Sequence, residues 1–173
     1  LGRLVGSEMC IRDSNRGISG KIEAIRYARE NQIPFLGICL GMQLSIIEFT
    51  KNVLKMKNSG SSEFGKHTNN VISLMTEWSK KNQKVTRTKE NDLGATMRLG
   101  SYPCYIKHKS LASKIYKKKL IHERHRHRYE VNPKYRSSIE KKGLVFSGFS
   151  KDKKLLEIIE NKYHKWFLGV QFH

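Results

Sequence analysis

The stretch from residue 34 to residue 54 limits most strongly what this chain can fold into. It begins with the short apolar run PFLGI, passes through Cys39, and continues with leucines and isoleucines at helical spacing. A glycine stands two residues away from Cys39 on each side, which gives the G-x-C-x-G spacing of a nucleophile elbow with sulfur in place of oxygen. We expect a turn that is too tight for any side chain at Gly37 or Gly41.

Such a turn would hold the Cys39 thiol at the carboxyl end of a strand and at the N-terminus of a helix. Backbone N–H groups and the helix dipole stabilise a thiolate there, and the next backbone N–H can contribute to an oxyanion hole. From the elbow alone, a buried and inert cysteine is an equally good interpretation, because free cysteines are commonly buried.

A candidate base stands at the other end of the sequence. The chain ends with WFLGVQFH, so His173 closes a second apolar strand. An imidazole at that position can deprotonate Cys39 and later protonate a leaving amine. We therefore expect Cys39 and His173 to end neighbouring strands at one edge of a sheet.

Helix, strand and helix follow one another closely in the first third of the chain. Residues 20–31 carry apolar side chains at helical spacing, with Ser19 as the expected N-cap. Pro34 then releases the chain into a short strand of the kind that is buried in parallel sheets. A second helix is expected over residues 40–54. This order predicts an α/β sheet with helices on its faces.

The rest of the chain reads as a polar region followed by strands. Residues 57–66 are expected to form a loop, and a weak helix or turn is expected around Trp78. The turn at residues 150–153 is expected to join two strands as a hairpin. The strand-like segments are residues 96–107, 144–150, 155–160 and 166–173.

Length and charge bound the class of protein. The chain has 173 residues, enough for one domain with its own core, and a formal net charge of +19. That charge attracts polyanions, so nucleic acid and nucleotide phosphates are both candidate partners. The lysines are dispersed, with residues 117–119 as the densest run, and stacking aromatics are not interleaved with them. We favour a solvated basic surface and predict no tight nucleic-acid binding.

Cysteine usage and hydropathy bear on the compartment. Three cysteines without a short spacing are not a disulfide framework, and they fit a reducing cytoplasm. No apolar run reaches about 18 residues, and no secretory leader is visible. We therefore expect a cytoplasmic chain without membrane contact.

The histidine-rich stretch HERHRHRYE has two further interpretations. His122, His125 and His127 could be metal ligands, but no cysteine or acidic cluster completes a site at a suitable spacing. An alternating basic strand could also bind RNA, but no aromatic platform is interleaved with it. Neither interpretation is favoured.

Several stretches, in order along the chain, resemble one family. IPFLGICLGMQ is similar to the nucleophile segment of class I glutamine amidotransferases. More narrowly, the chain resembles the C-terminal amidotransferase domain of the CTP synthase family over residues 15–173, through GKIEAIRYARENQIPFLGICLGMQ, SSEF, TMRLGSYPC, RHRHRYEVN, LVFSG and WFLGVQFH. The resemblance implies a flavodoxin-like α/β fold: a mostly parallel central sheet with helices on both faces and an added β-meander.

The resemblance also implies a glutaminase coupled to a second active site. A cysteine attacks the side-chain amide of glutamine, ammonia leaves, and water releases glutamate from the thioester. A separate N-terminal synthase domain uses ATP and magnesium to activate UTP, which ammonia converts to CTP, and GTP activates the glutaminase step. The amidotransferase domain needs no cofactor of its own. The implied partners are glutamine, the chain's own synthase domain and further copies in a homotetramer, with no membrane and no nucleic acid.

The family's functional residues carry over position by position. The nucleophile falls on Cys39 and the base on His173. The family's glutamate in STEF falls on Glu63, where a carboxylate suits the substrate's ammonium group. The arginine before the tyrosine of HRYE falls on Arg128, whose guanidinium can hold the substrate's α-carboxylate through two hydrogen bonds. The glutamine-binding segment falls on Leu40, Gly41, Met42 and Gln43.

Two departures from the family bear on activity. The family has a PGGFG loop whose glycines supply oxyanion-hole backbone, whereas residues 10–14 read CIRDS, with Arg12 at the position of a substrate-contacting glycine. We interpret residues 1–14 as a foreign leader and residues 15–173 as an amidotransferase domain truncated at both ends. The family continues after its histidine with Pro-Glu, and that glutamate orients the imidazole. We expect this chain alone to be a poor glutaminase. A noncatalytic amidotransferase-like domain and a basic nucleic-acid-binding module are the alternatives.

Restoring the family's sequence should raise the activity. With PGGFG at residues 10–14 and Pro-Glu appended after His173, we expect glutamate release to rise by about 100-fold or more, because one oxyanion-hole donor is worth about 100- to 1,000-fold. The measurement is glutamate release with a synthase domain supplied. The Cys39→Ser variant of the restored chain is the control, and equal turnover by that variant would refute the thiol mechanism.

Overall fold

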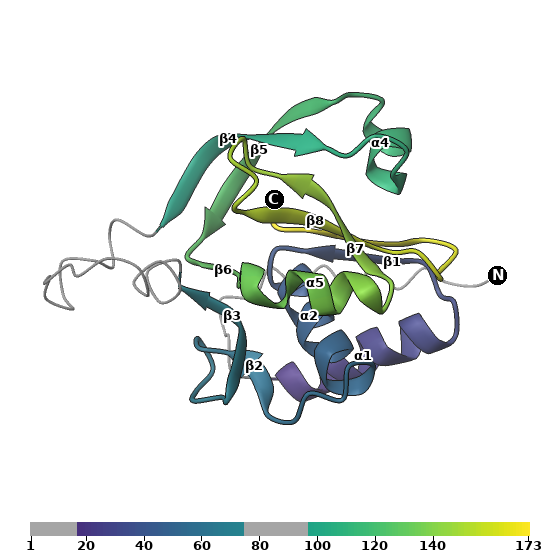
Figure 1. Cartoon of the computed structure of the whole chain (residues 1–173), viewed down its shortest axis with the longest axis vertical. Coiled ribbons are helices and arrows are strands. Elements are labelled where there is room, and N and C mark those ends of the chain that lie inside the picture. Colours follow the sequence, from purple (N-terminus) through teal and green to yellow (C-terminus); the bar gives the residue numbers. More distant parts are fainter. Residues whose placement is uncertain (1–16, 75–96) are drawn as a thin grey trace, which may run out of the picture.

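The computed structural model describes residues 17–74 and 97–173 (Figure 1). The expectations for Trp78 and for residues 10–14 fall outside this part of the chain. The described helices are α1 (Ile18–Glu30), α2 (Leu40–Asn52), α4 (Leu111–Tyr116) and α5 (Arg136–Lys141), with a 3-10 turn η2 (Pro133–Tyr135). The described strands are β1 (Phe35–Ile38), β2 (Ser59–Ser61), β3 (Asn69–Leu74), β4 (Arg98–Ile106), β5 (Leu120–His127), β6 (Tyr129–Val131), β7 (Leu144–Phe149), β8 (Leu156–Asn161) and β9 (Phe167–Val170).

These strands form two sheets. The larger has the order β1-β9-β8-β7-β4-β5, and the smaller has the order β2-β3-β6. In the larger sheet β1 and β9 pair in parallel, while every other described neighbour is antiparallel. The α/β class is confirmed, but the sheet is mixed rather than mostly parallel. The reason lies in the connections: β7, β8 and β9 are joined by residues 150–155 and 162–166, and such short turns permit only antiparallel pairing.

The larger sheet separates two apolar layers. In Figure 1, α1, α2 and α5 lie on one side of it, and α4 lies on the other side together with the ribbon of β4 and β5. The larger core contains buried side chains from α1, α2, α5 and the strands they cover. The smaller core packs Ala112 of α4 against side chains of β4, β5, β8 and β9. Helices therefore lie on both faces, as expected, but the second face is covered mainly by strands β4 and β5 of the same sheet, which curl over β8 and β9.

Most predicted elements are confirmed, with three corrections. The N-cap of α1 is Gly17 in a left-handed conformation, so Ser19 lies inside the first turn and does not cap it. The predicted loop at residues 57–66 contains β2, which forms a ladder with β3. The strand β1 is not buried on both faces, since it is an edge strand of the described sheet and exposes Leu36 (49%) and Ile38 (40%). The hairpin turn at residues 150–153 joins β7 to β8 as expected.

A buried ion pair holds α1 against α2. Glu48 of α2 is fully buried and accepts hydrogen bonds from Arg29 of α1 at 2.9 Å (Nε to Oε2) and 2.8 Å (Nη2 to Oε1). Asn52 donates a third bond to the same carboxylate at 3.1 Å. This fork fixes α1 and α2, the helices that come before and after the elbow.

Among the described residues, each helix is too short to cross a bilayer.

Breaking this pair should destabilise the fold. In Glu48→Gln, the Arg29 guanidinium keeps its burial but loses its buried counter-charge and retains only the exposed Glu30 at 3.1 Å, so we expect the free energy of unfolding to fall by about 3 kcal/mol. Glu23→Gln is the matched control, because Glu23 pairs with Arg26 at 3.6 Å on the exposed face of α1 and such pairs contribute less than about 1 kcal/mol. Urea unfolding measures both. Equal losses in the two variants would contradict this account of α1 and α2.

Candidate active site

The chain turns sharply at Cys39, between β1 and α2. Cys39 has φ 52° and ψ −101°, a left-handed backbone that costs a non-glycine residue about 1–3 kcal/mol. A Cβ at Gly37 would lie 2.7 Å from the carbonyl carbon of Gly41, so glycine is required at residue 37. A Cβ at Gly41 would meet no atom within 4 Å. The expected steric requirement is therefore confirmed for Gly37 and wrong for Gly41, which already lies in α2 and faces open space.

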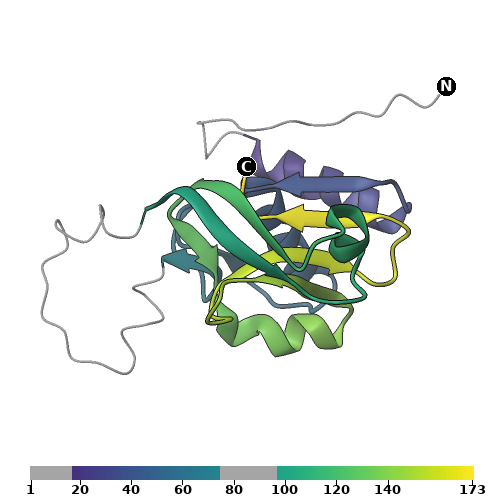
Figure 2. The ribbon, with the colours of Figure 1, turned by 90° about the horizontal axis from the view of Figure 1, so that it is seen from above.

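The elbow is fixed to the strand that leads to His173. β1 and β9 pair in parallel from Phe35 with Phe167 to Ile38 with Val170, as Figure 2 shows for the blue edge strand and the yellow strand beside it. The Cys39 backbone N–H donates to the Val170 carbonyl at 2.7 Å, which extends the ladder onto the elbow. Parallel strands end at one edge, so β1 and β9 are neighbouring strands as expected, and Cys39 directly follows β1. His173 does not close its strand, because β9 ends at Val170 and the His173 backbone bonds to Arg124 of β5. The catalytic roles of Cys39 and His173 stay predictions.

His173 has the protonation state that a base needs. Its backbone N–H donates to the carbonyl of Arg124 at 2.8 Å, which anchors the end of the chain on β5. Partial burial lowers the pKa of the His173 imidazole, and the positive charges of Arg124 and Arg126 lower it further. A neutral ring therefore predominates near pH 7, and a neutral ring can accept a proton.

The first turn of α2 contains two partly exposed residues followed by two buried ones. Leu40 and Gly41 are partly exposed beside the thiol, so a ligand can reach them. Met42 is fully buried in the core, and Gln43 is almost fully buried. The Gln43 side chain donates to the Tyr129 carbonyl at 3.0 Å and to Gln171 at 3.2 Å. The predicted contacts of Met42 and Gln43 with a substrate stay untested, and in this structure both side chains pack against protein.

The small sheet places Glu63 and Arg128 at one edge. Glu63 follows β2, which is parallel to β3, and Arg128 precedes β6, which is antiparallel to β3. Arg128 therefore lies just beyond the carboxyl end of β3, because Tyr129 pairs with Leu74, whereas Glu63 lies in the turn after Ser61, which pairs with Ile72 near the same end of β3. The Tyr129 carbonyl, next to Arg128, accepts the bond from Gln43 in the first turn of α2, so this edge faces the elbow helix. Burial of the Glu63 carboxyl raises its pKa, although the residue keeps an exposed surface.

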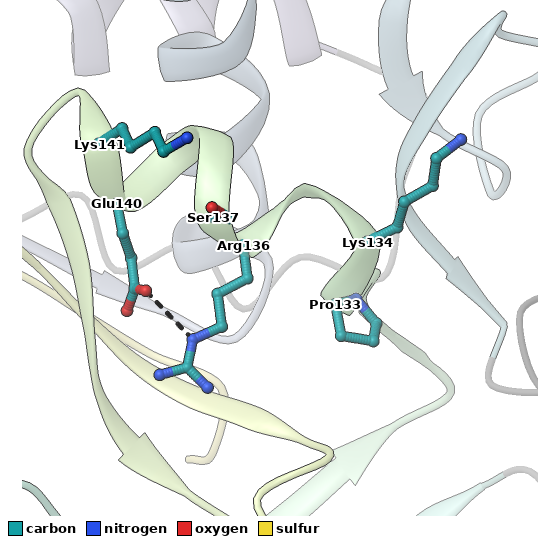
Figure 3. A pocket seen from close by; sticks show the side chains of 6 residues that line it. All are labelled: Pro133, Lys134, Arg136, Ser137, Glu140 and Lys141. Atoms are coloured by element: carbon teal, nitrogen blue, oxygen red, sulfur yellow. Dashed lines mark hydrogen bonds and ion pairs between the residues drawn. The ribbon is translucent and has the colours of Figure 1, made fainter.

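A shallow hollow of about 390 Å³ lies elsewhere (Figure 3). Its lining comes from η2 and α5, where Arg136 and Glu140 form an ion pair at 3.2 Å. Neither Cys39 nor His173 contributes to it, so we do not assign it to the candidate site.

Comparison with known proteins decides the family. A sequence model described as glutamine amidotransferase class-I matches residues 12–173. The chain belongs to the class-I glutamine amidotransferases. The match begins inside the leader expected over residues 1–14, and the boundary at residue 15 stays a prediction.

Within this family, the chain is clearly similar to curated CTP synthases. The chain is 60% identical over 158 residues to CTP synthase of Pelagibacter ubique (strain HTCC1062) and 56% identical over 161 residues to CTP synthase of Campylobacter jejuni (strain RM1221). Each comparison covers 91% of this chain but 29% of the relative, so the chain spans less than a third of the length of these curated proteins.

Solved structures agree with the fold. The glutaminase domain of Trypanosoma brucei CTPS with bound acivicin matches 92% of this chain and 59% of that chain, with a TM-score of 0.78 and 36% identity. A glutamine amidotransferase from Thermotoga maritima matches 90% of this chain and 46% of that chain, with a TM-score of 0.51 and 14% identity, and shows the fold alone.

A buried polar cluster beneath the site was missed by sequence reasoning. Arg98 of β4 donates to Glu130 of β6 at 3.3 Å and to Glu157 of β8 at 2.8 Å. His125 and His127 of β5 join it, with 2.8 Å between His125 Nδ1 and His127 Nε2. Four strands, β4, β5, β6 and β8, contribute side chains to this cluster. The one available signal was a carboxylate inside an apolar strand, as in LLEIIE, because such a residue requires a buried partner.

Hydrogen bonding indicates the tautomer of His127, and burial keeps both rings neutral. His127 Nδ1 lies 3.2 Å from the Tyr129 carbonyl, so it carries the hydrogen, and Nε2 accepts from His125. Burial, reinforced by Arg98, lowers the pKa of both histidines to about 3. Burial also raises the pKa of Glu130 to about 7, although Arg98 opposes that shift. Within residues 17–74 and 97–173, no three metal-binding side chains gather closely enough to hold an ion.

These histidines should make the fold sensitive to acid. Below pH 6.5 the unfolded chain takes up protons on His125 and His127 while the folded chain does not, so their contribution to stability is lost as pH falls toward 3. Glu130 acts in the opposite direction between pH 4.5 and about 7, because the folded chain keeps its proton there. Glu157 acts in the same direction as Glu130, because burial also raises its pKa, whereas His173 acts in the same direction as the two buried histidines.

We therefore expect the titration of His125 and His127 to decrease the free energy of unfolding between pH 6.5 and pH 4.5. In His127→Gln this decrease should be smaller by about 2 kcal/mol. His122→Gln is the control, since His122 is exposed on the same strand. Urea unfolding at several pH values gives both slopes. A slope in His127→Gln equal to that of His122→Gln would show that the buried histidines do not control acid stability.

Proposed function

We propose that this chain is the glutaminase part of a CTP synthase. It hydrolyses glutamine through a thioester on Cys39 and supplies ammonia for the ATP-dependent amination of UTP to CTP. The observation that carries the proposal is the strained Cys39 elbow, bonded directly to the strand that continues to His173. The 60% identity to a CTP synthase supports the choice within the family.

The chemistry divides between the thiol and the imidazole. Neutral His173 takes the proton of the Cys39 thiol, and the thiolate attacks the carboxamide carbon of glutamine. The resulting oxyanion accepts a hydrogen bond from the Leu40 backbone N–H, which belongs to a helix start and has no partner within its helix. His173 then gives its proton to the leaving nitrogen, and ammonia departs. In the second half, His173 takes a proton from water, hydroxide attacks the thioester, and the thiolate leaves as glutamate forms.

Two charged side chains fit the two ends of the substrate backbone. Arg128 can pair with the α-carboxylate through both arms of its guanidinium. Glu63 can pair with the α-ammonium group. Both residues lie near the carboxyl end of β3, and Tyr129, next to Arg128, accepts a hydrogen bond from Gln43 of the elbow helix, which supports binding of one small zwitterion between them.

The remaining partners belong to the whole enzyme. The amidotransferase chemistry uses no metal or cofactor. The proposal therefore assigns ATP and magnesium to a synthase domain, GTP to activation of the glutaminase step, and four copies to the complete assembly. A cytoplasmic location fits these substrates.

Covalent labelling tests the nucleophile. A diazo-ketone analogue of glutamine should modify Cys39, and an excess of glutamine should slow the reaction. Cys104 should stay unmodified, because it is fully buried and burial, with Glu157 nearby, raises the pKa of its thiol. Peptide mass spectrometry locates the adduct. Cys39→Ser should abolish labelling and Cys104→Ala should preserve it. An adduct found mainly on Cys10 or Cys104 would refute the proposal.

A further inference from the structure

Gln171 lies between the elbow and the interior of the protein. It follows β9 directly, and its side chain is fully buried. Its backbone N–H donates to the Glu157 carbonyl at 2.8 Å, so the backbone is held on β8. Its side-chain Nε2 lies 3.7 Å from the Cys39 sulfur, within reach of an N–H···S hydrogen bond. Neither the elbow motif nor the proposed mechanism assigns a role to this amide.

The neighbours of Gln171 determine which end of its amide faces the sulfur. Gln43 Nε2 donates to the Tyr129 backbone carbonyl at 3.0 Å, and a carbonyl can only accept, so the orientation of the Gln43 amide is fixed. The same nitrogen lies 3.2 Å from Gln171 Oε1, which therefore accepts. The NH₂ group of Gln171 is left facing Cys39. Two buried amides thus form a directed chain from a backbone carbonyl to the thiol.

We propose that Gln171 donates a hydrogen bond to the Cys39 sulfur and favours its thiolate form, with Gln43 acting through it as a positioning residue. A donor stabilises the charged form of an acceptor more than the neutral form. The bond comes from a rigid buried group, so no reorganisation is needed when the thiolate forms. The role in catalysis rests on the proposed function, whereas the effect on ionisation does not.

The arrangement also accounts for two buried glutamines in one place. A buried amide costs free energy unless its donors and acceptors are paired. An apolar pair would fill the same space without that requirement. The free-energy cost of burying these amides is offset if they stabilise the Cys39 thiolate. The contact of Gln171 with Cys39, the strained residue of the elbow, is consistent with this role.

The test is the pH dependence of Cys39 alkylation. Iodoacetamide reacts with thiolate, so the rate at Cys39, followed by peptide mass spectrometry, reports ionisation without any substrate. In Gln171→Leu the pH of half-maximal rate should rise by about one unit, a tenfold loss of thiolate at lower pH. In Gln171→Glu it should rise further, because a carboxylate repels the thiolate. In Gln43→Leu the rise should be smaller, because the Gln171 donor remains but loses its orientation.

Gln32→Glu is the matched control, since it makes the same charge change at an exposed glutamine and should leave the midpoint unchanged. A measurement on the unaltered chain covers the case in which the Gln171 variants do not fold. In the unaltered chain, the chemical shift of the Gln171 side-chain amide ¹⁵N should change with pH, and its midpoint should equal the midpoint of Cys39 alkylation. A folded Gln171→Leu with the native midpoint, or an amide resonance that does not respond, overturns the inference. Failure of the diazo-ketone to label Cys39, with the midpoint still shifted in Gln171→Leu, would refute the proposed function and support the inference.

Discussion

The parallel ladder between β1 and β9 is the interaction on which the site depends. It aligns the two strands residue by residue and continues through the 2.7 Å bond from Cys39 to Val170. That bond holds a backbone conformation that an isolated peptide would leave, because the strain of about 1–3 kcal/mol must be offset by the surrounding structure. Since the nucleophile and the candidate base follow the two paired strands, one ladder places both. Loss of the pairing would remove the elbow and separate Cys39 from His173 together.

A second layer of interactions supports that edge from below. The Arg98 cluster joins β4, β6 and β8 through one guanidinium and two carboxylates, and the neutral pair His125 and His127 continues it along β5. β5 in turn anchors the end of the chain, because the Arg124 carbonyl accepts from the His173 backbone and the His125 ring packs edge-on against Phe172. The polar core thus includes side chains of β5, the strand to which the His173 backbone is bonded. Arg98 pairs with both carboxyl groups, and removing it would leave buried charge unpaired at a cost of several kcal/mol.

Local sequence was a good guide wherever a pattern repeats over one element. The helices around residues 20–31 and 40–54, the strand before Cys39 and the hairpin at residues 150–153 follow from apolar spacing and turn residues, and each is present. The prediction failed where the answer depended on partners. Gly17 rather than Ser19 caps α1, β2 forms within an apparent loop because β3 offers it a ladder, and the sheet is mixed because short turns join β7, β8 and β9.

The candidate site also has one part that the local sequence predicts and another that depends on tertiary contacts. The sequence by itself determined the elbow, because strand, Gly37, Cys39 and helix are adjacent in the chain and the steric limit at Gly37 is local. It also identified the apolar strand β9, although that strand ends at Val170 and not at His173. Only the tertiary structure decided that Gln171 reaches the sulfur, that Glu63 and Arg128 share one edge, and that Arg98 is buried between two carboxylates. The hydrogen-bonded pairs among these residues are 32 to 132 positions apart in the sequence. No periodicity encodes such pairs, since they arise when packed strands bring distant side chains into the low-dielectric interior, where each polar group must find a partner.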